Sequence, residues 1–373
     1  MRLDANQQAF LALVRAGLWE WSVQLSPYGG MDLGVVCRLA EEQSVIGLVA
    51  AGLEQVSDVV LPKEETLVFV GGALPLEQRN TKMNALVAQL FDSLREAGAH
   101  PVLVKGQGLA QCYERPLWRA CGDVDLLLCD DDYEKAKAVL LPQAVQVSSE
   151  YTLFKHVGLT LAGGFDVEIH GTQHTRLSRR VDRMIDDMQR RIFLGGKVRP
   201  WMVGDTRVLL PAPDGAVIIV FTHILHHFFF EGIGLRQICD WCRLLWTFRE
   251  AIDAELLQRR LRAAGLMTEW RAFAAMAVDW LGMPAEAMPL YSADARWSRK
   301  GARIVADVLK VGNFGQNRRP STRRSQPYLR RKFRSFWSRL GSILRHFLIF
   351  PRDSVFFFGG VLRSGLYAVA RGE

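Results

Sequence analysis

Two aspartates separated by one apolar residue are the side chains in this sequence best placed to do chemistry. Asp123 and Asp125 lie in residues 103–128, LVKGQGLAQCYERPLWRACGDVDLLL, on the second of two apolar stretches. Side chains alternate between the faces of a β-strand, so both carboxylates should point one way while Val124 and Leu126 enter a core. They would lie about 6 to 7 Å apart, close enough to share a divalent cation such as Mg²⁺.

A second acidic strand is predicted at residues 165–170, FDVEIH, where apolar and polar residues alternate and Glu168 lies on the polar face. If this strand lies beside the first, Glu168 completes a site of three carboxylates. An isolated pair of aspartates is common on solvated strand ends. The second acidic strand, together with Lys105 and the glycines after it, makes metal-dependent phosphoryl transfer the favoured interpretation.

These motifs carry a family resemblance. Residues 105–128 are similar to the signature of the uncharacterised nucleotidyltransferase family of the polymerase-β-like superfamily, in which an LKG segment, a tyrosine, a proline and an arginine precede DIDLL. VEIH at 167–170 and HILHHFFFEGIGLRQICDWCRLL at 223–245 also resemble that family, so the similarity covers residues 102–245. It implies an α+β fold with a nucleotidyltransferase-like mixed sheet, flanking helices, and further helical regions at both ends of the chain.

The resemblance also implies a ligand set and a reaction. Asp123 and Asp125 would hold the cation, Mg²⁺ or Mn²⁺, that accompanies a nucleoside triphosphate. Glu168 would be the third carboxylate, helping to hold a second cation and to favour deprotonation of the attacking hydroxyl. Nucleotidyl transfer needs little beyond positioning and charge neutralisation, which such cations supply.

The resemblance places the triphosphate at the turn from Gly106 to Gly108 and the helix that follows it. Characterised members of the superfamily carry Gly-Ser at this point, whereas this chain has Lys105-Gly106-Gln107-Gly108. Without the serine hydroxyl, phosphate contacts would fall to backbone amides and to Lys105, since helix amino termini present unpaired N–H groups. The departure leaves open whether the site is catalytically competent.

Three further residues have more than one interpretation. Arg119, four residues before Asp123, either binds phosphate or pairs with an acidic neighbour. His170 either orients Glu168 or contacts the acceptor, or is simply a hydrogen-bonded histidine at a strand end. His227 shares one helical face with His223 and His226, a face that either approaches the acceptor or packs on the sheet domain.

Composition bounds the class of protein. The chain has 373 residues, of which 49% are hydrophobic, enough for one large or two medium cores. Its six cysteines lack the spacing of a disulfide framework and no apolar leader is apparent, which together predict a cytoplasmic location. The pair Cys239 and Cys242 lacks the partners of a zinc site, so we interpret these as core residues.

Periodicity divides the chain into four parts. Residues 1–98 have the apolar spacing of amphipathic helices, and residues 99–210 alternate short apolar runs with helix-length segments, as in a mixed sheet. Within the latter, a hairpin is expected around Gly158, leading through Gly163 and Gly164 into the Glu168 strand. Residues 211–295 return to helices, and residues 296–373 form a basic, aromatic-rich amphipathic tail.

The tail predicts an anionic partner. From residue 296 onward there are eighteen lysines or arginines against three acidic residues, while the whole chain carries +8. Basic helices rich in aromatics lie in membrane interfaces, so we expect residues 330–370 to attach the protein to the inner membrane face. RNA is the less favoured partner because no RNA-binding motif is present. A third interpretation is that the tail packs on the acidic body.

Two functions follow. The favoured one is a Mg²⁺-dependent enzyme that moves a nucleotidyl group from a nucleoside triphosphate to a hydroxyl- or phosphate-bearing acceptor. Resemblance to the family suggests a role in bacterial surface-polysaccharide synthesis. The alternative is a non-catalytic module of the same fold that its basic tail tethers to a membrane or to RNA.

Overall fold

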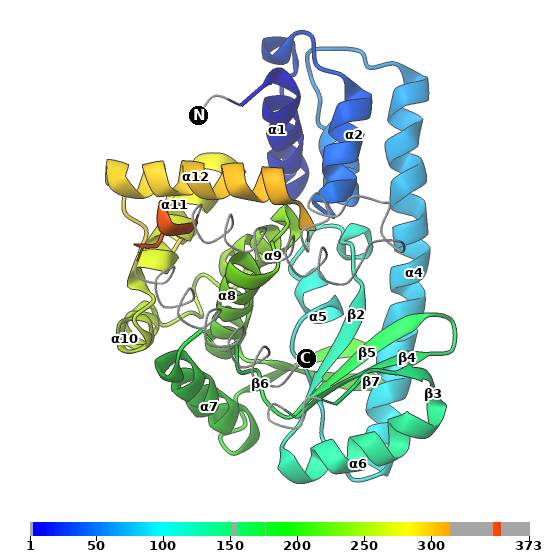
Figure 1. Cartoon of the computed structure of the whole chain (residues 1–373). Helices are drawn as coiled ribbons and strands as arrows, with labels where there is room; N and C mark the ends of the chain where they lie inside the picture. The colour runs from blue at the N-terminus through cyan, green and yellow to red at the C-terminus, as the bar shows by residue number, and fades with distance from the viewer. Residues whose placement is uncertain (1–2, 151–154, 176, 314–345, 352–373) are drawn as a thin grey trace, which may run out of the picture.

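The computed structural model describes residues 3–150, 155–175, 177–313 and 346–351 (Figure 1). Within these residues the chain has the predicted α+β architecture: a five-stranded mixed sheet, a two-stranded hairpin, and helices that flank both. The sheet lies at one end of the molecule, and the first and last helices lie at the other (Figure 1).

The five-stranded sheet places a parallel pair of strands at its centre. Strand β2 (Asp123–Leu127) runs parallel to β5 (Phe165–His170), with Asp125 directly opposite Glu168. The remaining pairings are antiparallel, and the strand order is β1-β2-β5-β4-β3. The other three strands are β1 (Val102–Leu103), β4 (His156–Leu161) and β3 (Ala144–Val147).

Alternation along the strands separates a core face from a polar face. Val124, Leu126, Val167 and Ile169 are buried in one cluster with side chains of α4 (Lys63–Glu96) and α6 (Asp130–Leu140). Full burial of such a side chain contributes about 1.5 to 3 kcal/mol, which fixes the register. The acidic residues are consequently held on the opposite face.

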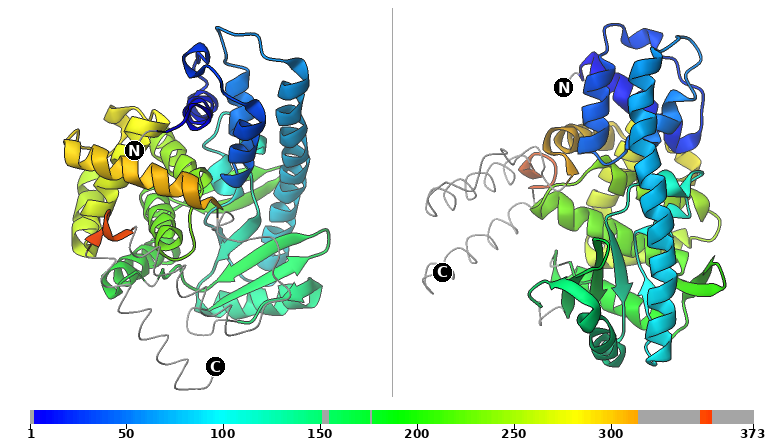
Figure 2. Two further views of the ribbon diagram at one scale, coloured as in Figure 1. Left: turned by 45° about the horizontal axis from the view of Figure 1, so that its top comes forward. Right: turned by 90° about the vertical axis from the view of Figure 1, so that its right-hand side faces the viewer.

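Helix α4 connects the two ends of the molecule. Its 34 residues run beside the N-terminal helices at one end and under the sheet at the other (Figures 1 and 2). Near its middle, Asn80 donates hydrogen bonds to the carbonyl oxygens of Leu117 and Arg119, at 2.7 and 2.8 Å, and accepts one from Gln107 at 2.8 Å. These bonds fix the segment that enters β2.

The N-terminal region is helical, as the apolar spacing predicted. It comprises α1 (Ala5–Trp19), α2 (Leu33–Glu42) and α3 (Ile46–Leu53). Helices α1 and α3 approach closely at Gly17, where a Cβ would lie 1.8 Å from the carbonyl oxygen of Leu48, so only glycine fits there.

The C-terminal helices enclose the side of the molecule next to the sheet's polar face. They are α8 (Pro213–Phe230), α9 (Leu235–Thr247), α10 (Ala254–Ala264), α11 (Met267–Leu281) and α12 (Ala295–Val311). By length and composition α8 could cross a membrane, but most of it is buried inside the protein. The remaining elements are α5 (Gln107–Ala110), α7 (Arg179–Phe193), β6 (Val198–Val203) and β7 (Thr206–Pro211).

Two expectations need correction. Gly158 does not form a hairpin turn but lies inside β4, opposite Glu168, because β4 pairs along its whole length with β5. The turn into β5 is formed instead at Gly163 and Gly164, both with positive φ. The basic tail does not begin at residue 296: residues 296–311 belong to α12, which buries Trp297 and Ile304 in the main core.

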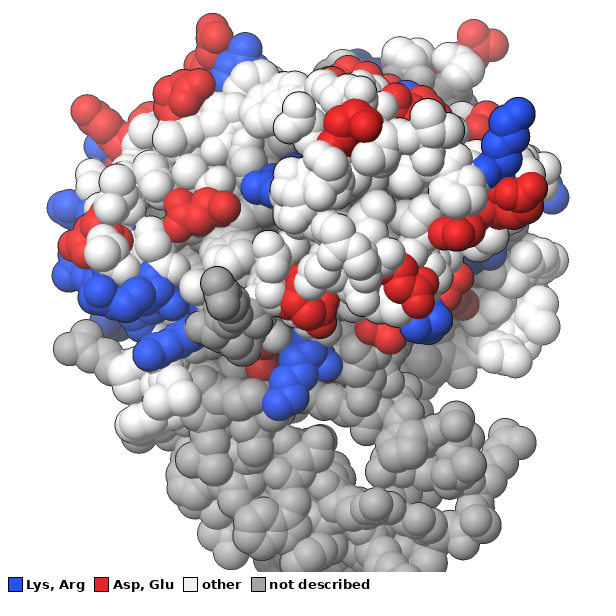
Figure 3. All heavy atoms as spheres, turned by 90° about the horizontal axis from the view of Figure 1, so that it is seen from above, with Lys and Arg blue, Asp and Glu red and all other residues white. Residues whose placement is uncertain are grey.

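Most of the predicted tail falls outside the described residues, namely 314–345 and 352–373. The described piece between them packs on the helical core: Phe350 is buried against Phe273 and Phe228, and His346 lies 3.2 Å from Asp307. Seen from above, basic side chains of the described residues are densest at one edge and also occur elsewhere on this face, and acidic ones are spread around a largely uncharged centre (Figure 3).

Candidate metal centre

The three carboxylates predicted to share a cation lie together. Asp123 and Asp125 project from one face of β2, and Glu168 projects from the same face of β5 at the level of Asp125. One oxygen from each carboxylate lies within 4.8 Å of the others. The parallel pairing of the two strands produces this convergence, because it sets Asp125 and Glu168 side by side. Their service as metal ligands stays a prediction.

Lys105 and His170 reach into this carboxylate cluster. Lys105 Nζ lies 2.8 Å from Asp125 Oδ1. His170 Nε2 lies 3.0 Å from the same oxygen and 3.2 Å from Glu168 Oε2. Charge-assisted contacts of this length are strong ones. These contacts hold the Asp125 and Glu168 side chains in place.

The three carboxylates are not equivalent electrostatically. Burial opposes ionisation of Asp125, but Lys105 and His170 prevail and lower its pKa. Burial likewise opposes ionisation of Glu168, and hydrogen bonds from His156 and His170 lower its pKa. At Asp123, burial and then the neighbouring Asp125 carboxylate raise the pKa. Asp123 is therefore the carboxylate that gains most from an additional cation.

The pKa values of Lys105 and His170 are both raised. Burial disfavours the charged form of Lys105, but Asp125 and Glu168 outweigh it and raise the pKa of the ammonium. Burial also acts against charge on His170, where hydrogen bonds to the same two carboxylates raise the pKa. Lys105 therefore carries a positive charge at neutral pH.

The carboxylates open into a cavity of about 600 Å³, a size typical of small-molecule sites. Its lining includes residues of the polar strand face and of α8. Three histidines of α8 belong to that lining: His223, His226 and His227. The histidine-bearing face of α8 and the polar face of the sheet thus border one space.

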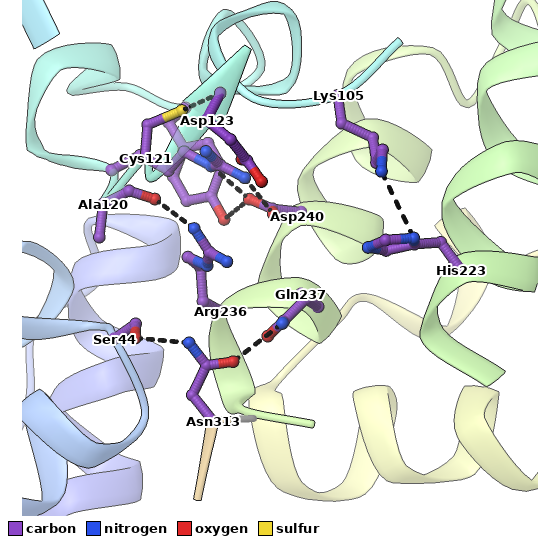
Figure 4. A network of polar contacts seen from close by, with 12 residues as sticks. Ser44, Lys105, Ala120, Cys121, Asp123, His223, Arg236, Gln237, Asp240 and Asn313 are labelled. Carbon is purple, nitrogen blue, oxygen red and sulfur yellow. Dashed lines mark hydrogen bonds and ion pairs between the residues drawn. The ribbon is translucent and has the colours of Figure 1, made fainter. Parts of the chain in front are cut away.

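The α8 histidines have distinct partners. His223 faces Lys105, with 3.5 Å between Nδ1 and Nζ (Figure 4). Burial, followed by the charge of Lys105, holds the pKa of His223 well below its usual range, so the ring is neutral. His226 Nδ1 donates to the carbonyl oxygen of Thr175 at 2.8 Å, and His227 lies 2.8 Å from Glu231.

The glycine turn is only partly what the sequence suggested. Gly106 lines the cavity with φ +56°, a conformation that favours glycine. Gly108 faces away from it: a Cβ there would lie 2.6 Å from Leu210, so this glycine serves packing. Helix α5 has only four residues, and the N–H groups of Gly108 and Ala110 already donate within the turn. Phosphate binding would therefore depend mainly on Lys105.

Arg119 takes the second of its two predicted partners, an acidic neighbour. Its Nε and Nη2 lie 2.9 and 2.6 Å from the two carboxylate oxygens of Asp240, and Tyr113 donates to Asp240 at 2.7 Å. In Figure 4 dashed lines end on the carboxylate of the labelled Asp240. Arg119 also lines the cavity, and its buried Nη1 has no hydrogen-bond partner among the described residues.

His156 is the site residue that sequence reasoning missed. It lies on β4 with Nε2 3.3 Å from Glu168 Oε2, and its ring stacks on that of His170 with 4.6 Å between centroids. The alternation of His156, Gly158 and Thr160 with apolar residues was the available signal. The expected turn at Gly158 concealed it.

Comparison with known proteins gives one match. A family model described as "Uncharacterised nucleotidyltransferase" matches residues 30–282, which include every residue of the cavity discussed above. No curated protein and no solved structure matches the chain.

Proposed function

This chain belongs to the uncharacterised nucleotidyltransferase family, and from that premise we propose that its cavity transfers a nucleoside monophosphate from a nucleoside triphosphate to a hydroxyl- or phosphate-bearing acceptor. The observation that carries the proposal is the convergence of Asp123, Asp125 and Glu168 at the wall of a cavity that also contains Lys105. Oxygen ligands beside a cationic side chain are the usual equipment for binding a triphosphate.

The donor set fits the divalent cation that such a reaction needs. Three carboxylate oxygens within 4.8 Å of one another suit a hard ion such as Mg²⁺ or Mn²⁺. The raised pKa of Asp123 points the same way, because that carboxylate has less compensation than its neighbours. Asp123, Asp125 and Glu168 would hold the ion. When bound, it would neutralise charge on the phosphates and on the oxygens that attack and leave.

The protein's own side chains have assignable tasks. Lys105 is 12% exposed and keeps its charge, so its ammonium can move from Asp125 to a phosphate oxygen of the nucleotide. Neutral His223 accepts a hydrogen bond from Lys105 and would keep the ammonium directed into the cavity. On the far wall, His227 with Glu231 is placed to meet the acceptor.

Location and acceptor are also part of the proposal. We propose a cytoplasmic protein that attaches to an anionic membrane surface through residues 330–370 and acts on a lipid-linked or sugar acceptor of surface-polysaccharide synthesis. Support comes from the basic, aromatic composition of that segment, most of which lies outside the described residues. Nucleic acid is the less favoured partner.

A direct test uses the purified protein with Mg²⁺, nucleoside triphosphates and a mixture of hydroxyl and phosphate acceptors. We expect pyrophosphate release to fall by roughly 10³-fold in Asp125→Asn, since the loss of a metal ligand removes several kcal/mol of charge stabilisation. Asp166→Asn is the matched control: it makes the same change on β5, but Asp166 pairs with Thr160 and does not line the cavity. Absence of Mg²⁺-dependent triphosphate binding in the wild-type protein would overturn the proposal.

A second candidate is favoured by the contact between Lys105 and Asp125. An ammonium 2.8 Å from that carboxylate, with His170 beside it, partly neutralises the cluster without any metal ion. A non-catalytic module of this fold would therefore be sustainable. It predicts that truncation after Asn313 removes the biological effect while Asp125→Asn leaves it intact. The opposite pattern would exclude it.

A further inference from the structure

We propose that His156, Glu168 and His170 form a transition-metal site of their own, and that Glu168 is shared between this site and the carboxylate cluster. One ligating atom from each of the three lies within 4.8 Å of the others. The inference concerns the binding of a second, softer cation, and it holds whether or not the cavity transfers nucleotides.

The sheet builds this arrangement in advance. His156 on β4 and His170 on β5 are cross-strand partners in the antiparallel register, so their side chains project from the same face next to each other. Glu168 lies two residues before His170 and therefore on that face too. Gly158, opposite Glu168, adds no side chain between them. Three ligands on two paired strands are held by the sheet rather than by loops.

The contacts already converge on one oxygen. Nε2 of His156 and Nε2 of His170 lie 3.3 and 3.2 Å from Glu168 Oε2. The two rings are stacked with planes 18° apart, and both Nε2 atoms face the same carboxylate oxygen. A metal ion bound by both rings would take the place of the Nε2 protons that now donate to Glu168, with each ring keeping its proton on Nδ1.

The chemistry of the donors selects the class of ion. Two imidazoles and one carboxylate suit Zn²⁺, Fe²⁺, Co²⁺ or Ni²⁺, whereas Mg²⁺ prefers oxygen ligands. Three protein ligands also leave coordination positions open, as in catalytic rather than structural zinc sites. Here the open side faces the cavity, since all three residues line it. An anionic group or water in the cavity would complete the coordination.

Sharing Glu168 links the two cation sites. The oxygen-rich site has Asp123 and Asp125 as its own ligands, and the nitrogen-rich site has His156. His170 connects them, because its Nε2 also lies 3.0 Å from Asp125. Occupation of the nitrogen-rich site would draw His170 away from Asp125 and leave Lys105 as that carboxylate's remaining cationic partner.

Titration of the untagged, chelator-treated full-length protein with Co²⁺ tests the inference, because Co²⁺ bound to nitrogen ligands gives visible d–d absorption. We expect one equivalent to bind. His156→Ala should weaken binding by at least about 100-fold, since changes merely in the surroundings of metal ligands cost about 10- to 100-fold. His174→Ala is the matched control: its side chain is 25% exposed, against 27% for His156, and lines the same cavity outside the ligand group.

A variant of the oxygen-rich site separates this inference from the proposed function. Asp123→Asn should keep the Co²⁺ spectrum while losing Mg²⁺-dependent triphosphate binding. If the wild-type protein shows the spectrum but never binds triphosphate, the proposed function fails and the second site stands. If Co²⁺ produces no d–d absorption, or if His156→Ala binds it as tightly as the wild type, the second site is refuted whatever the triphosphate result.

Discussion

Two clusters of buried charge lie within the same cavity wall, and they are built in opposite ways. Arg119 and Asp240, with side chains 5% and 3% exposed, balance each other charge for charge. Both oxygens of Asp240 accept hydrogen bonds, from Arg119 and Tyr113. In the second cluster, Asp123, Asp125 and Glu168 bring three carboxylates together.

The carboxylate cluster is incomplete, because Asp123 has no ion pair among the described residues, whereas Arg119 and Asp240 are matched one to one. Asp125 and Glu168 find cationic partners in Lys105 and His170, but the Asp123 side chain makes no hydrogen bond within the described part of the chain. Buried charges that are matched one for one serve the structure, even though Arg119 Nη1 has no hydrogen-bond partner among the described residues, whereas buried charge in excess indicates a missing ligand. The difference between the clusters therefore separates scaffold from site.

The largest effect should come from unbalancing the closed pair. Asp240→Asn leaves the Arg119 guanidinium buried without an opposite charge, which typically costs about 3 to 5 kcal/mol of unfolding free energy. Urea denaturation monitored by tryptophan fluorescence would measure it. Tyr113→Phe is the control, because it removes a single hydrogen bond to Asp240 and should cost about 1 kcal/mol. Wild-type stability in Asp240→Asn, combined with lost triphosphate binding, would place this pair in the site and break the comparison.

Removing a charge from the carboxylate cluster should raise the free energy of unfolding instead of lowering it. The folded-state pKa of Asp123 is raised above its ordinary 3.8. At pH values above the folded-state pKa, ionisation of Asp123 therefore lowers the free energy of unfolding. Asp123→Asn should therefore stabilise the chelator-treated protein at neutral pH by about 1 to 2 kcal/mol. Added Mg²⁺ should stabilise only the wild type and so reverse the order. A destabilised variant in chelator would show that Asp123 is structural.

The smallest effect sharpens the comparison through pH. The pKa of His170 is raised above its ordinary 6.5, so the stability that its charge contributes is complete below about pH 6.5 and is lost as pH rises through the folded-state pKa. In chelator, the wild type should exceed His170→Gln most at the acidic end of this range, by less than about 1 kcal/mol. Urea unfolding at a series of pH values would measure the difference. A constant difference would mean that His170 stays neutral throughout.

Much of the site follows from local pattern. The period-two alternation in β2 and β5 was enough to place Asp123, Asp125 and Glu168 on one face. The apolar residues that alternate with them are buried on the opposite face, and a shift of either strand by one residue would expose them. The N-terminal helices were equally predictable from apolar spacing. In each case the determining interactions lie within a few residues of one another in the sequence.

Long-range partners account for what the sequence did not show. Arg119 meets Asp240 across more than a hundred residues, and no local signal distinguishes that partner from a phosphate. Glycine is typical of turns, so the sequence around Gly158 does not mark His156 as part of a strand, whereas pairing with β5 keeps the chain extended through Gly158. Gly108 likewise packs against Leu210, a residue distant in the sequence, and no local pattern indicates that contact. The basic residues of α12 resemble those of the tail in charge, and the charge pattern hides the apolar residues with which α12 packs on α11.

The parallel pairing of β2 with β5 also has a consequence for biosynthesis. Strands that run parallel cannot be joined by a tight turn, and α6, β3 and β4 are threaded between these two. A nascent chain leaving the ribosome therefore keeps its aspartates apart from Glu168 until His170 has been translated and the contact has closed, an entropically slow event. Metal ions would accordingly be acquired by a finished sheet instead of nucleating it.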